Sequence, residues 1–421
     1  MRPRNLFSFV LLLMLSMPLQ AAVSDDEFKA LRAEFAALAQ RLNALEAENA
    51  ELKAANAQTI KDVAVSREQV ASLEKRKSSA SWTETIKWKG DFRYRYENID
   101  EEDRDDRDRN RIRARAALIA KLPDDVEIGL GLATGGDDPV STNQTLGGGG
   151  STKDVRLDLA YANWGATEEL NIIGGKFKNI FYRPSKHGLI FDGDFNPEGV
   201  GVVFKKDWFF ANVGGTWLES DTKGDNDSYS WGGQLGYKGS IAGAKVTAGA
   251  AYYNFDTEGK GVFFGDDDEF FGNSFVCADP DDLGSCVYEY DYNIVQGFAE
   301  VSMNVADMPV TVFADYVVND DADDEDTGYA VGIKVGKTKG WGTWQLGYTY
   351  QDLEADAVFG LITDSDFGGG GTDGEGHIFK GSLGINKRWS VGVTYFANEI
   401  DENAGNEHDY DRIQIDTKFK Y

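Results

Sequence analysis

From residue 83 onward the chain repeats short segments in which apolar and polar residues alternate. In residues 343–350, Trp344, Leu346, Tyr348 and Tyr350 fall on one face, and Thr, Gln, Gly and Thr fall on the other. Sixteen such segments begin near Thr83, Arg109, Asp124, Lys153, Glu169, Glu198, Trp208, Tyr229, Ala242, Tyr288, Pro309, Thr327, Trp341, Gly376, Trp389 and His408. An even number of half-apolar strands predicts an all-β membrane protein, a 16-stranded antiparallel transmembrane β-barrel.

The connections between these segments alternate in length. Those after odd-numbered segments are mostly long and acidic, as in residues 135–152 and 354–375, whereas those after even-numbered segments are tight, as in residues 122–124. A membrane barrel with long loops at one end and short turns at the other explains this alternation, which a soluble sandwich does not. The segment 288–303 loses its alternation near Ile294, which indicates either a β-bulge or a misplaced boundary.

Residues 1–22 have the pattern of a secretory signal peptide. Arg2 and Arg4 precede an apolar stretch from Leu6 to Leu15, and small residues at Ala21 and Ala22 offer a cleavage site. Export favours a local disulfide between Cys277 and Cys286 over a metal site, because both cysteines lie in one loop of a secreted chain.

Residues 25–77 carry a heptad seam, with apolar residues at alternating steps of three and four. The seam includes Leu31, Phe35, Leu38, Leu42, Leu45, Asn49, Leu52 and Asn56. This pattern predicts a coiled coil that oligomerises the chain and serves as a spacer helix, in which the two asparagines fix the register. The alternative is a single amphipathic helix packed on another domain. Residues 78–82 are the expected linker, and residues 83–421 the barrel.

The formal charge of −28, which becomes −30 without Arg2 and Arg4, argues against nucleic acid as a partner. Acidic runs at 266–269 and 320–326 could bind divalent cations, but they lack the spacing and glycine of a calcium loop, so solvated loop charge is the simpler interpretation. The sequence predicts no metal site and no cofactor.

Arginines alternate with apolar residues in two neighbouring segments. Arg93 and Arg95 occur in the first segment and Arg111, Arg113 and Arg115 in the second. Arginine facing lipid at mid-bilayer would cost about 2 to 4 kcal/mol, so these side chains are expected to face the lumen. Arg156 in the fourth segment is expected to join them.

The combination of signal peptide, coiled coil, sixteen segments and terminal aromatic residue resembles the Putative porin family of Gram-negative outer membranes, and its architecture resembles that of classical trimeric porins. The resemblance covers essentially the whole mature chain. It implies an outer-membrane location with the coiled coil in the periplasm, a homotrimer, and contacts with outer-membrane lipid and lipopolysaccharide. The last residues, including Phe419 and Tyr421, are similar to the insertion signal read by the barrel-assembly machinery, with Tyr in place of the commoner Phe.

In classical porins the loop after the fifth strand narrows the lumen, and the resemblance implies this role for the connection from Lys176 to Pro197. We expect a constriction in which Asp192, Asp194 and Glu198 face the arginines across water. Simple solvated loop charges are the alternative. The arginines favour anions locally, whereas acidic outer loops concentrate cations at the mouth, so the sign of selectivity is left open.

These features predict a water-filled channel for passive diffusion of ions and small hydrophilic solutes. One alternative is a structural tether, in which the coiled coil links the outer membrane to the cell wall. A barrel-rim enzyme is another, but only His187, His377 and His408 are available, and no Gly-x-Ser-x-Gly motif accompanies them. The sequence therefore predicts no enzymatic activity.

Overall fold

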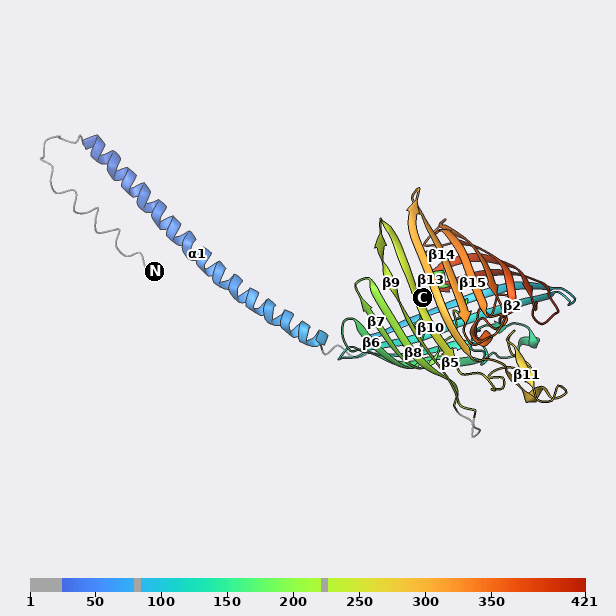
Figure 1. Ribbon diagram of the computed structural model, residues 1–421. Helices are drawn as coiled ribbons and strands as arrows, with labels where there is room; N and C mark the ends of the chain where they lie inside the picture. Colours follow the sequence, from blue (N-terminus) through green and yellow to red (C-terminus); the bar gives the residue numbers. More distant parts are fainter. Residues whose placement is uncertain (1–24, 79–84, 221–225) are drawn as a thin grey trace. The chain divides into compact units, whose positions relative to one another are not determined.

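The computed structural model describes residues 25–78, 85–220 and 226–421, which divide into a helical unit ending at Ala80 and a second unit from Ser81 (Figure 1). The predicted signal peptide, residues 79–82 of the predicted linker and the start of the predicted barrel domain at residue 83 lie outside the described residues. Among those described, no helix is both long and apolar enough to cross a membrane.

The helical unit contains one helix, α1 (Asp25–Ser78), which at about 1.5 Å per residue is about 80 Å long. Its sequence is rich in Ala, Glu, Lys and Gln, which are good helix formers. All eight predicted seam residues lie on α1, and the apolar side chains of Phe35, Leu38, Leu42, Leu45 and Leu52 are exposed. In this single chain the seam has no partner among the described residues.

The second unit is a closed antiparallel barrel of sixteen strands, so the predicted fold is confirmed. The strands are β1 (Ile86–Glu101), β2 (Arg107–Lys121), β3 (Val126–Thr134), β5 (Val155–Gly165), β6 (Leu170–Lys176), β7 (Glu198–Lys206), β8 (Phe209–Glu219), β9 (Ser228–Ile241), β10 (Ala244–Phe255), β13 (Tyr292–Val305), β14 (Met308–Asn319), β15 (Thr327–Gly336), β16 (Trp344–Leu353), β17 (Gly374–Gly384), β18 (Trp389–Ile400) and β19 (His408–Lys420). Each pairs with its neighbour in the sequence, and β1 also pairs with β19.

Among the described residues, three further short strands lie in the connections. β4 (Gln144–Thr145) pairs with β2, and β11 (Phe275–Cys277) forms a small separate hairpin with β12 (Cys286–Tyr288). A disulfide joins Cys277 to Cys286 across this hairpin. In the part of the chain that the structure describes, the connections also contain four single 3-10 turns, η2 (Gly148–Gly150), η3 (Pro184–Lys186), η4 (Leu283–Ser285) and η5 (Gly360–Ile362).

The end of the chain closes the barrel. Phe92 of β1 lies opposite Phe419 of β19, and the backbones of Gly90 and Tyr421 exchange two hydrogen bonds of 3.1 Å. The Phe419 ring stacks on Trp389 at 5.1 Å between centroids, and the Tyr421 ring stacks on Trp88 at 6.4 Å. The two residues of the predicted insertion signal therefore occupy the joint between the first and last strands.

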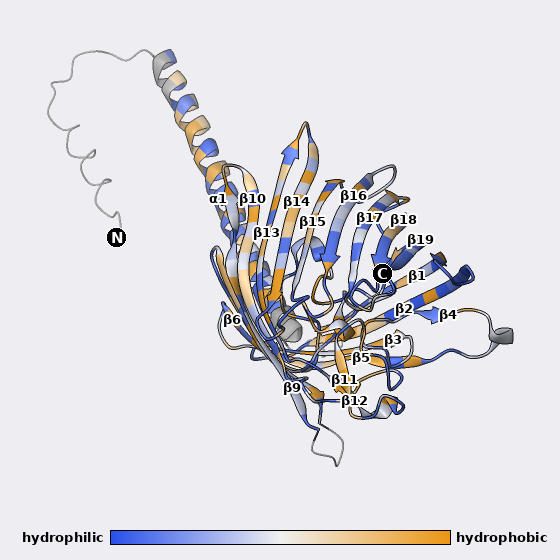
Figure 2. Ribbon diagram, turned by 45° about the vertical axis from the view of Figure 1, so that its right-hand side comes forward, coloured by the Kyte–Doolittle hydropathy of each residue, from blue (hydrophilic) through white to orange (hydrophobic). Residues whose placement is uncertain are grey.

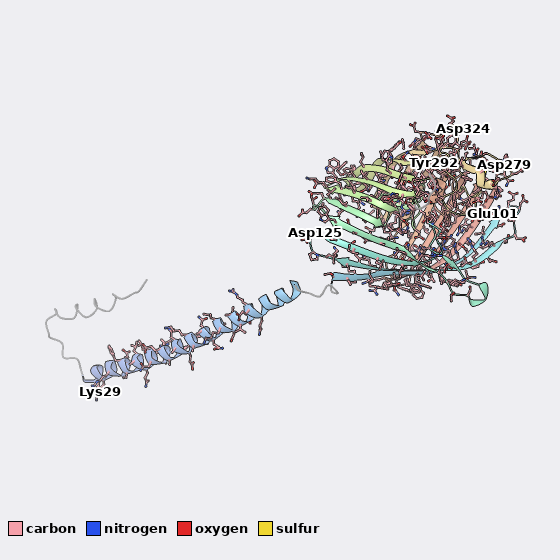
Figure 3. The ribbon with its side chains drawn as sticks, turned by 90° about the horizontal axis from the view of Figure 1, so that it is seen from below. Lys29, Glu101, Asp125, Asp279, Tyr292 and Asp324 are labelled. Atoms are coloured by element: carbon pink, nitrogen blue, oxygen red, sulfur yellow. A yellow bond between two sulfur atoms is a disulfide. The ribbon has the colours of Figure 1, made fainter. Side chains whose placement is uncertain are left out.

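The two ends of the barrel differ in the length of their connections. Two of the short connections, Ala242-Gly243 and Ala306-Asp307, have a positive φ at both residues, the geometry that fits the right-handed twist of a hairpin. Figure 3 shows Asp125, which belongs to a short turn, at one end, and Glu101 at the end of β1 with Asp279 and Asp324 of the longer connections at the other. We call these the turn end and the loop end.

The segment that loses its alternation near Ile294 contains no bulge. Its pairing with β10 and with β14 runs without a shift, and β13 begins at Tyr292, because Tyr288 belongs to β12. Of the two interpretations, the misplaced boundary is therefore correct. The register shifts lie elsewhere, between Gly131 and Leu132 and between Trp217 and Glu219.

The strands have an apolar outer face and a more polar inner face. On β1, Trp88, Phe92 and Tyr94 are exposed on the outside, whereas Arg93 and Arg95 are buried on the inside. Figure 2 shows the same alternation of hydrophobic and hydrophilic residues along many strands. This is the period-2 pattern that a membrane barrel requires.

Parts of three long connections fold into the lumen and fill some of it. We call residues 177–197, 256–291 and 354–373 the plug. Phe191, Phe270, Tyr288, Phe359 and Ile362 of the plug form one buried cluster with inward-facing side chains of β10 and β13 to β16. The connections described above as acidic outer loops thus contain much of the apolar core of the barrel, and coil segments are enclosed by the strands in Figure 2.

Candidate functional site

Seven arginines on three adjacent strands face the lumen on the side away from the apolar cluster of the plug. We call them the arginine row: Arg93 and Arg95 on β1, Arg109, Arg111, Arg113 and Arg115 on β2, and Arg412 on β19. They share the inner face because residues two apart on a strand point the same way. Pairing of β1 with both β2 and β19 brings the three sets side by side.

The buried arginines in the middle of the row form ion pairs with carboxylates. Arg95 donates to Asp416 at 2.8 Å and to Asp366 at 2.9 Å. Arg412, which is only 2 % exposed, contacts Glu97 at 2.6 Å and Asp366 at 2.8 Å. Glu97 also contacts Arg109 at 2.6 Å and Arg111 at 3.3 Å. Such charge-assisted contacts are among the stronger polar interactions in proteins.

A second group of ion pairs joins the row to the plug. Arg113 and Arg115 contact Asp194 at 3.1 and 2.6 Å, and both also contact Asp91 of β1 at 3.1 and 2.8 Å. Arg93 donates to Asn143 at 2.5 Å. Asp194 is therefore in direct contact with the arginines, and no water-filled gap separates them.

The positive charges of the arginine row lower the pKa of the two plug carboxylates that contact it, Asp194 and Asp366. Burial alone would raise the pKa of Asp194, but Arg113 and Arg115 reverse this effect and lower it. Burial opposes ionisation of Asp366 in the same way, yet Arg95 and Arg412 hold its pKa well below the usual range. Both groups are therefore ionised at neutral pH.

Three predicted site residues do not join this network. Arg156 pairs with Asp154 at 3.3 Å and its side chain is 53 % exposed. Glu198 pairs with Lys176 at 2.8 Å and is 64 % exposed. Neither residue contacts the arginine row, because each lies at the start of its strand, where a strand meets its loop. The alternation predicts whether a side chain lies on the inner or the outer face of the barrel. It does not predict how far along the barrel axis the side chain lies.

Asp192 lines the middle of the lumen with Arg93 and Arg113 but forms no ion pair with either. It accepts hydrogen bonds from the backbone N–H groups of Asp194 and Ser365 and forms no ion pair among the described residues. Burial, reinforced by Asp364, raises the pKa of Asp192 well above its ordinary value. Two carboxyl groups two residues apart thus have opposite electrostatic environments.

Several members of the network were not predicted. Arg412 and Asp416 alternate with Ile413 and Ile415, so the same period-2 argument that selected the other arginines could have found them. Asp366 lies in the connection after β16, and no local pattern marks it. Its position depends on how the plug folds.

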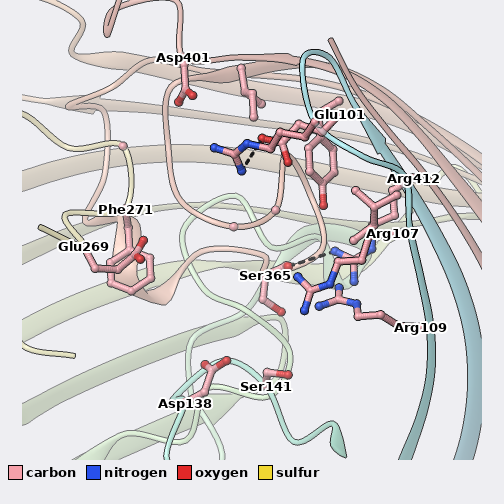
Figure 4. Close-up of a pocket in the computed structure, with 18 of the residues that line it drawn as sticks. Glu101, Arg107, Arg109, Asp138, Ser141, Glu269, Phe271, Ser365, Asp401 and Arg412 are labelled. Atoms are coloured by element: carbon pink, nitrogen blue, oxygen red, sulfur yellow. Dashed lines mark hydrogen bonds and ion pairs between the residues drawn. The ribbon is translucent and has the colours of Figure 1, made fainter. Parts of the chain in front are cut away.

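Three cavities adjoin the row and the plug. The loop-end cavity, about 580 Å³, is lined by Arg107, Arg109 and Arg111 and is shown in Figure 4 with Glu269 and Phe271 on its opposite side. The middle cavity, about 340 Å³, lies against Arg93 and Arg113. The turn-end cavity, about 700 Å³, reaches the tight connection between β7 and β8.

Shared residues connect these cavities in sequence. Ser365 lines both the loop-end and the middle cavity. Lys186 and Gly193 line both the middle and the turn-end cavity. The three spaces therefore adjoin one another from the loop end of the barrel to its turn end.

A closed sixteen-stranded antiparallel barrel with an apolar outer face and a charged lumen is the architecture of an outer-membrane β-barrel protein. Residues 99–261 and 285–421 match the sequence profile of the family described as Putative porin. The chain belongs to the Putative porin family, and membership assigns it to the outer membrane as a porin-type channel. The predicted resemblance is thereby confirmed.

Solved structures are similar to the chain at low sequence identity. The chain is similar to OprB of Pseudomonas putida, with 13% identity, 80% of this chain and 95% of that chain covered, and a TM-score of 0.54. Salmonella typhi OmpF, solved in complex with daunomycin, matches with 11% identity, 80% and 99% coverage and a TM-score of 0.48. No curated protein sequence matches the chain.

Proposed function

We propose that the barrel lets ions and small hydrophilic solutes diffuse passively through its lumen, along the three adjoining cavities. The observation that carries this proposal is the sharing of lining residues, Ser365 at one junction and Lys186 with Gly193 at the other. Charged side chains line much of this path, so water can solvate a solute along it. The apolar cluster of the plug fills the other side of the lumen.

Residues 177–197 are proposed as the constriction. On one wall the Tyr182 N–H donates to Gln234 of β9 at 2.6 Å, and Lys334 of β15 donates to the Ser185 carbonyl oxygen. On the arginine side of the lumen, Asp194 contacts Arg113 and Arg115. A segment held on both sides of the lumen supports a fixed narrowing rather than a mobile loop. Direct ion pairs replace the water gap expected from the sequence.

Burial keeps this segment neutral where it meets the apolar side. His187 lies 2.7 Å from Gln351 of β16 through its Nε2 atom, and burial lowers its pKa to about 3. The imidazole is therefore uncharged at neutral pH. The proposed constriction thus presents the charge of Asp194 to the arginine row and the neutral His187 ring to the apolar side of the lumen.

We further propose that α1 forms a coiled coil in a homotrimer and that the turn end faces the periplasm. The support is the row of exposed apolar side chains on α1, since water-exposed Phe35, Leu38 and Leu42 would be buried by copies of the same helix. The barrel-assembly machinery, outer-membrane lipid, lipopolysaccharide and the cell wall remain proposed partners. Sedimentation of the purified chain, with Leu38→Asp/Leu45→Asp as the dissociating variant, tests the oligomer.

Single-channel conductance of the purified protein in a planar bilayer tests the pore. Gly193 is the best site for a blocking variant, because its backbone φ is not left-handed and a Cβ atom there would lie 3.6 Å from the nearest atom, on Arg183. Gly193→Trp should lower the conductance severalfold by placing an indole where two cavities meet. Gly136→Trp is the matched control, because nothing lies within 4 Å of a Cβ atom at this exposed loop position. A folded barrel that carries no current would favour the tether.

A further inference from the structure

The turn-end cavity differs from the other two in its charge. Four basic residues, Arg183, Lys186, Lys205 and Lys238, line it with one acidic residue, Asp207. The loop-end cavity has five residues of each sign, and the middle cavity has six basic against five acidic. In a chain with a formal net charge of −28, so strong a local excess of positive charge requires a specific explanation.

These four basic side chains form no direct ion pair with a described carboxylate. Among the described residues none of the four has an ion pair within 4.0 Å, in contrast to the neighbouring Lys206, which pairs with Glu169 at 3.8 Å. The Arg183 guanidinium donates to the carbonyl oxygen of Phe191 at 2.7 Å. Lys186, Lys205 and Lys238 are exposed to the lumen solvent. Their charge is therefore available to a solute.

Aromatic rings form the other part of the wall. Phe181, Tyr182 and Phe210 line the cavity, and the Tyr182 ring lies 6.2 Å from Phe210 and 5.6 Å from Phe298. The Lys238 Nζ atom lies 5.1 Å from the centre of the Tyr182 ring, which brings a cation and an aromatic face to one place. The middle cavity has only one aromatic residue in its lining, Phe396.

Backbone geometry fixes one of the four basic residues, Lys186, at the junction of the turn-end and middle cavities. Ser185 and Lys186 both have left-handed φ values, 52° and 61°, which non-glycine residues rarely adopt. Contacts on both sides hold this turn: the Ser185 N–H donates to Glu300 at 2.5 Å, and Lys334 donates to the Ser185 carbonyl oxygen. Lys186 is thereby held where the middle and turn-end cavities meet.

We propose that the turn-end cavity binds small organic anions that combine a planar apolar ring with a carboxylate, and that it makes the channel selective for this class. The ring packs against the aromatic wall that Tyr182 and Phe210 form, and the carboxylate lies among Lys186, Lys205 and Lys238. The volume of about 700 Å³ is within the range of ordinary small-molecule sites. This proposal rests on the proposed pore function and names the solute class for it.

The experiment compares four solutes on the same open channel in a KCl bath. Benzoate carries both features, acetate only the charge, benzyl alcohol only the ring, and benzylammonium the ring with the opposite charge. We expect benzoate to interrupt the current at concentrations roughly tenfold lower than any of the other three, which corresponds to about 1.4 kcal/mol. Equal effects of benzoate and acetate, or of benzoate and benzyl alcohol, would overturn the proposal.

Neighbouring lysines provide a matched pair of variants. Lys205 faces the lumen and lines the cavity, whereas Lys206 lies next to it on β7 and pairs with Glu169 away from the site. Lys205→Gln should weaken the benzoate block severalfold, and Lys206→Gln should leave it unchanged. If both variants weaken it equally, general electrostatics and not this cavity is responsible.

Failure of the pore and failure of the binding site remain distinguishable. An open channel without discrimination among the four solutes rejects the site and leaves the pore. A folded barrel without current rejects the pore, and equilibrium dialysis of radiolabelled benzoate against the same detergent-solubilised protein then decides the site. Benzoate retained by the wild type and by Lys206→Gln but not by Lys205→Gln would support the site in that case.

Discussion

The two sides of the lumen are packed by different kinds of side chain. The apolar side, lined by β10 and β13 to β16, packs aromatic and aliphatic side chains of the plug against inward-facing Tyr253, Phe255 and Ile294. The charged side, lined by β1, β2 and β19, holds seven arginines against the carboxylates Asp91, Glu97, Asp194, Asp366 and Asp416. The loop-end and middle cavities lie against this charged side.

The difference shows how one barrel can be both stable and open. Apolar groups gain free energy by excluding water, so the plug closes on the apolar side. Guanidinium and carboxylate groups lose hydration when buried and need many partners in return, which keeps their surroundings polar. Residues 177–197 and 354–373 cross from one side to the other, and they carry Asp194 and Asp366 to the arginines.

The largest expected effect comes from the centre of the apolar side. Phe359 is fully buried and its ring lies 5.5 to 5.9 Å from those of Phe255, Tyr288 and Tyr292. Phe359→Ala should lower the free energy of unfolding by about 3 to 5 kcal/mol, through the lost packing and the cavity left behind. Guanidinium-induced unfolding in lipid vesicles, followed by tryptophan fluorescence, measures this change.

An exposed apolar residue of the same plug is the control. Leu283 is 47 % exposed in η4, so Leu283→Ala should change the free energy of unfolding by less than about 0.5 kcal/mol. Equal losses in the two variants would mean that the plug is not a packed core.

A substitution on the charged side should lower the free energy of unfolding less, because Arg95 and Arg412 each contact more than one carboxylate. Asp366→Asn removes a carboxylate from Arg95 and Arg412, yet Arg95 keeps Asp416 and Arg412 keeps Glu97. We expect a loss of about 2 kcal/mol in the same unfolding experiment, less than for a buried arginine left without any partner. A loss larger than that of Phe359→Ala would reverse the ranking of the two sides.

A third prediction uses pH to separate two carboxylates of one segment. Asp194 has a lowered folded-state pKa, so its stabilisation is present above the unfolded value of about 4 and is lost as pH falls through the folded value. Asp192 has a raised folded-state pKa, so its burial opposes folding at neutral pH, and this penalty disappears as pH falls toward about 4.

Unfolding free energies at pH 4 to 7.5 should therefore change in opposite directions in the two variants. Asp194→Asn should lose stability at neutral pH, and Asp192→Asn should gain it, each on the order of 1 kcal/mol, with the gain shrinking as the medium is acidified. Asp106→Asn, in an exposed loop, is the control. Changes of the same sign in both variants would contradict the opposite environments.

The barrel could be predicted from the sequence because its signal is local and repeated. Alternation with period 2 places every side chain on one of two faces, and each start predicted for a barrel strand lies within a few residues of the observed one, including Glu198 and His408. The plug could not be predicted in this way. Phe359 and Ile362 lie in a connection with no regular period, and only the folded barrel provides the surface that buries them.

The same limit applies to the site. The face of Arg93, Arg113 and Arg115 followed from the alternation and from the cost of placing arginine in lipid. Asp366, the partner of Arg95 and more than 200 residues away from it along the chain, follows from no local rule. Alternation also fails to give the height of a residue in the barrel, which is why Arg156 was grouped with arginines that it does not contact.

Arg156 therefore gives the last and smallest prediction. Its exposed pair with Asp154 should contribute no more than about 0.5 kcal/mol, so Arg156→Gln should leave both the stability and the reversal potential in a KCl gradient close to those of the wild type. Arg113→Gln, on the row itself, should shift the reversal potential toward cation preference, because it removes a positive charge beside the middle cavity. If the two variants shifted the potential equally, the permeating ions would sense the charge of the loop end and not the arginine row.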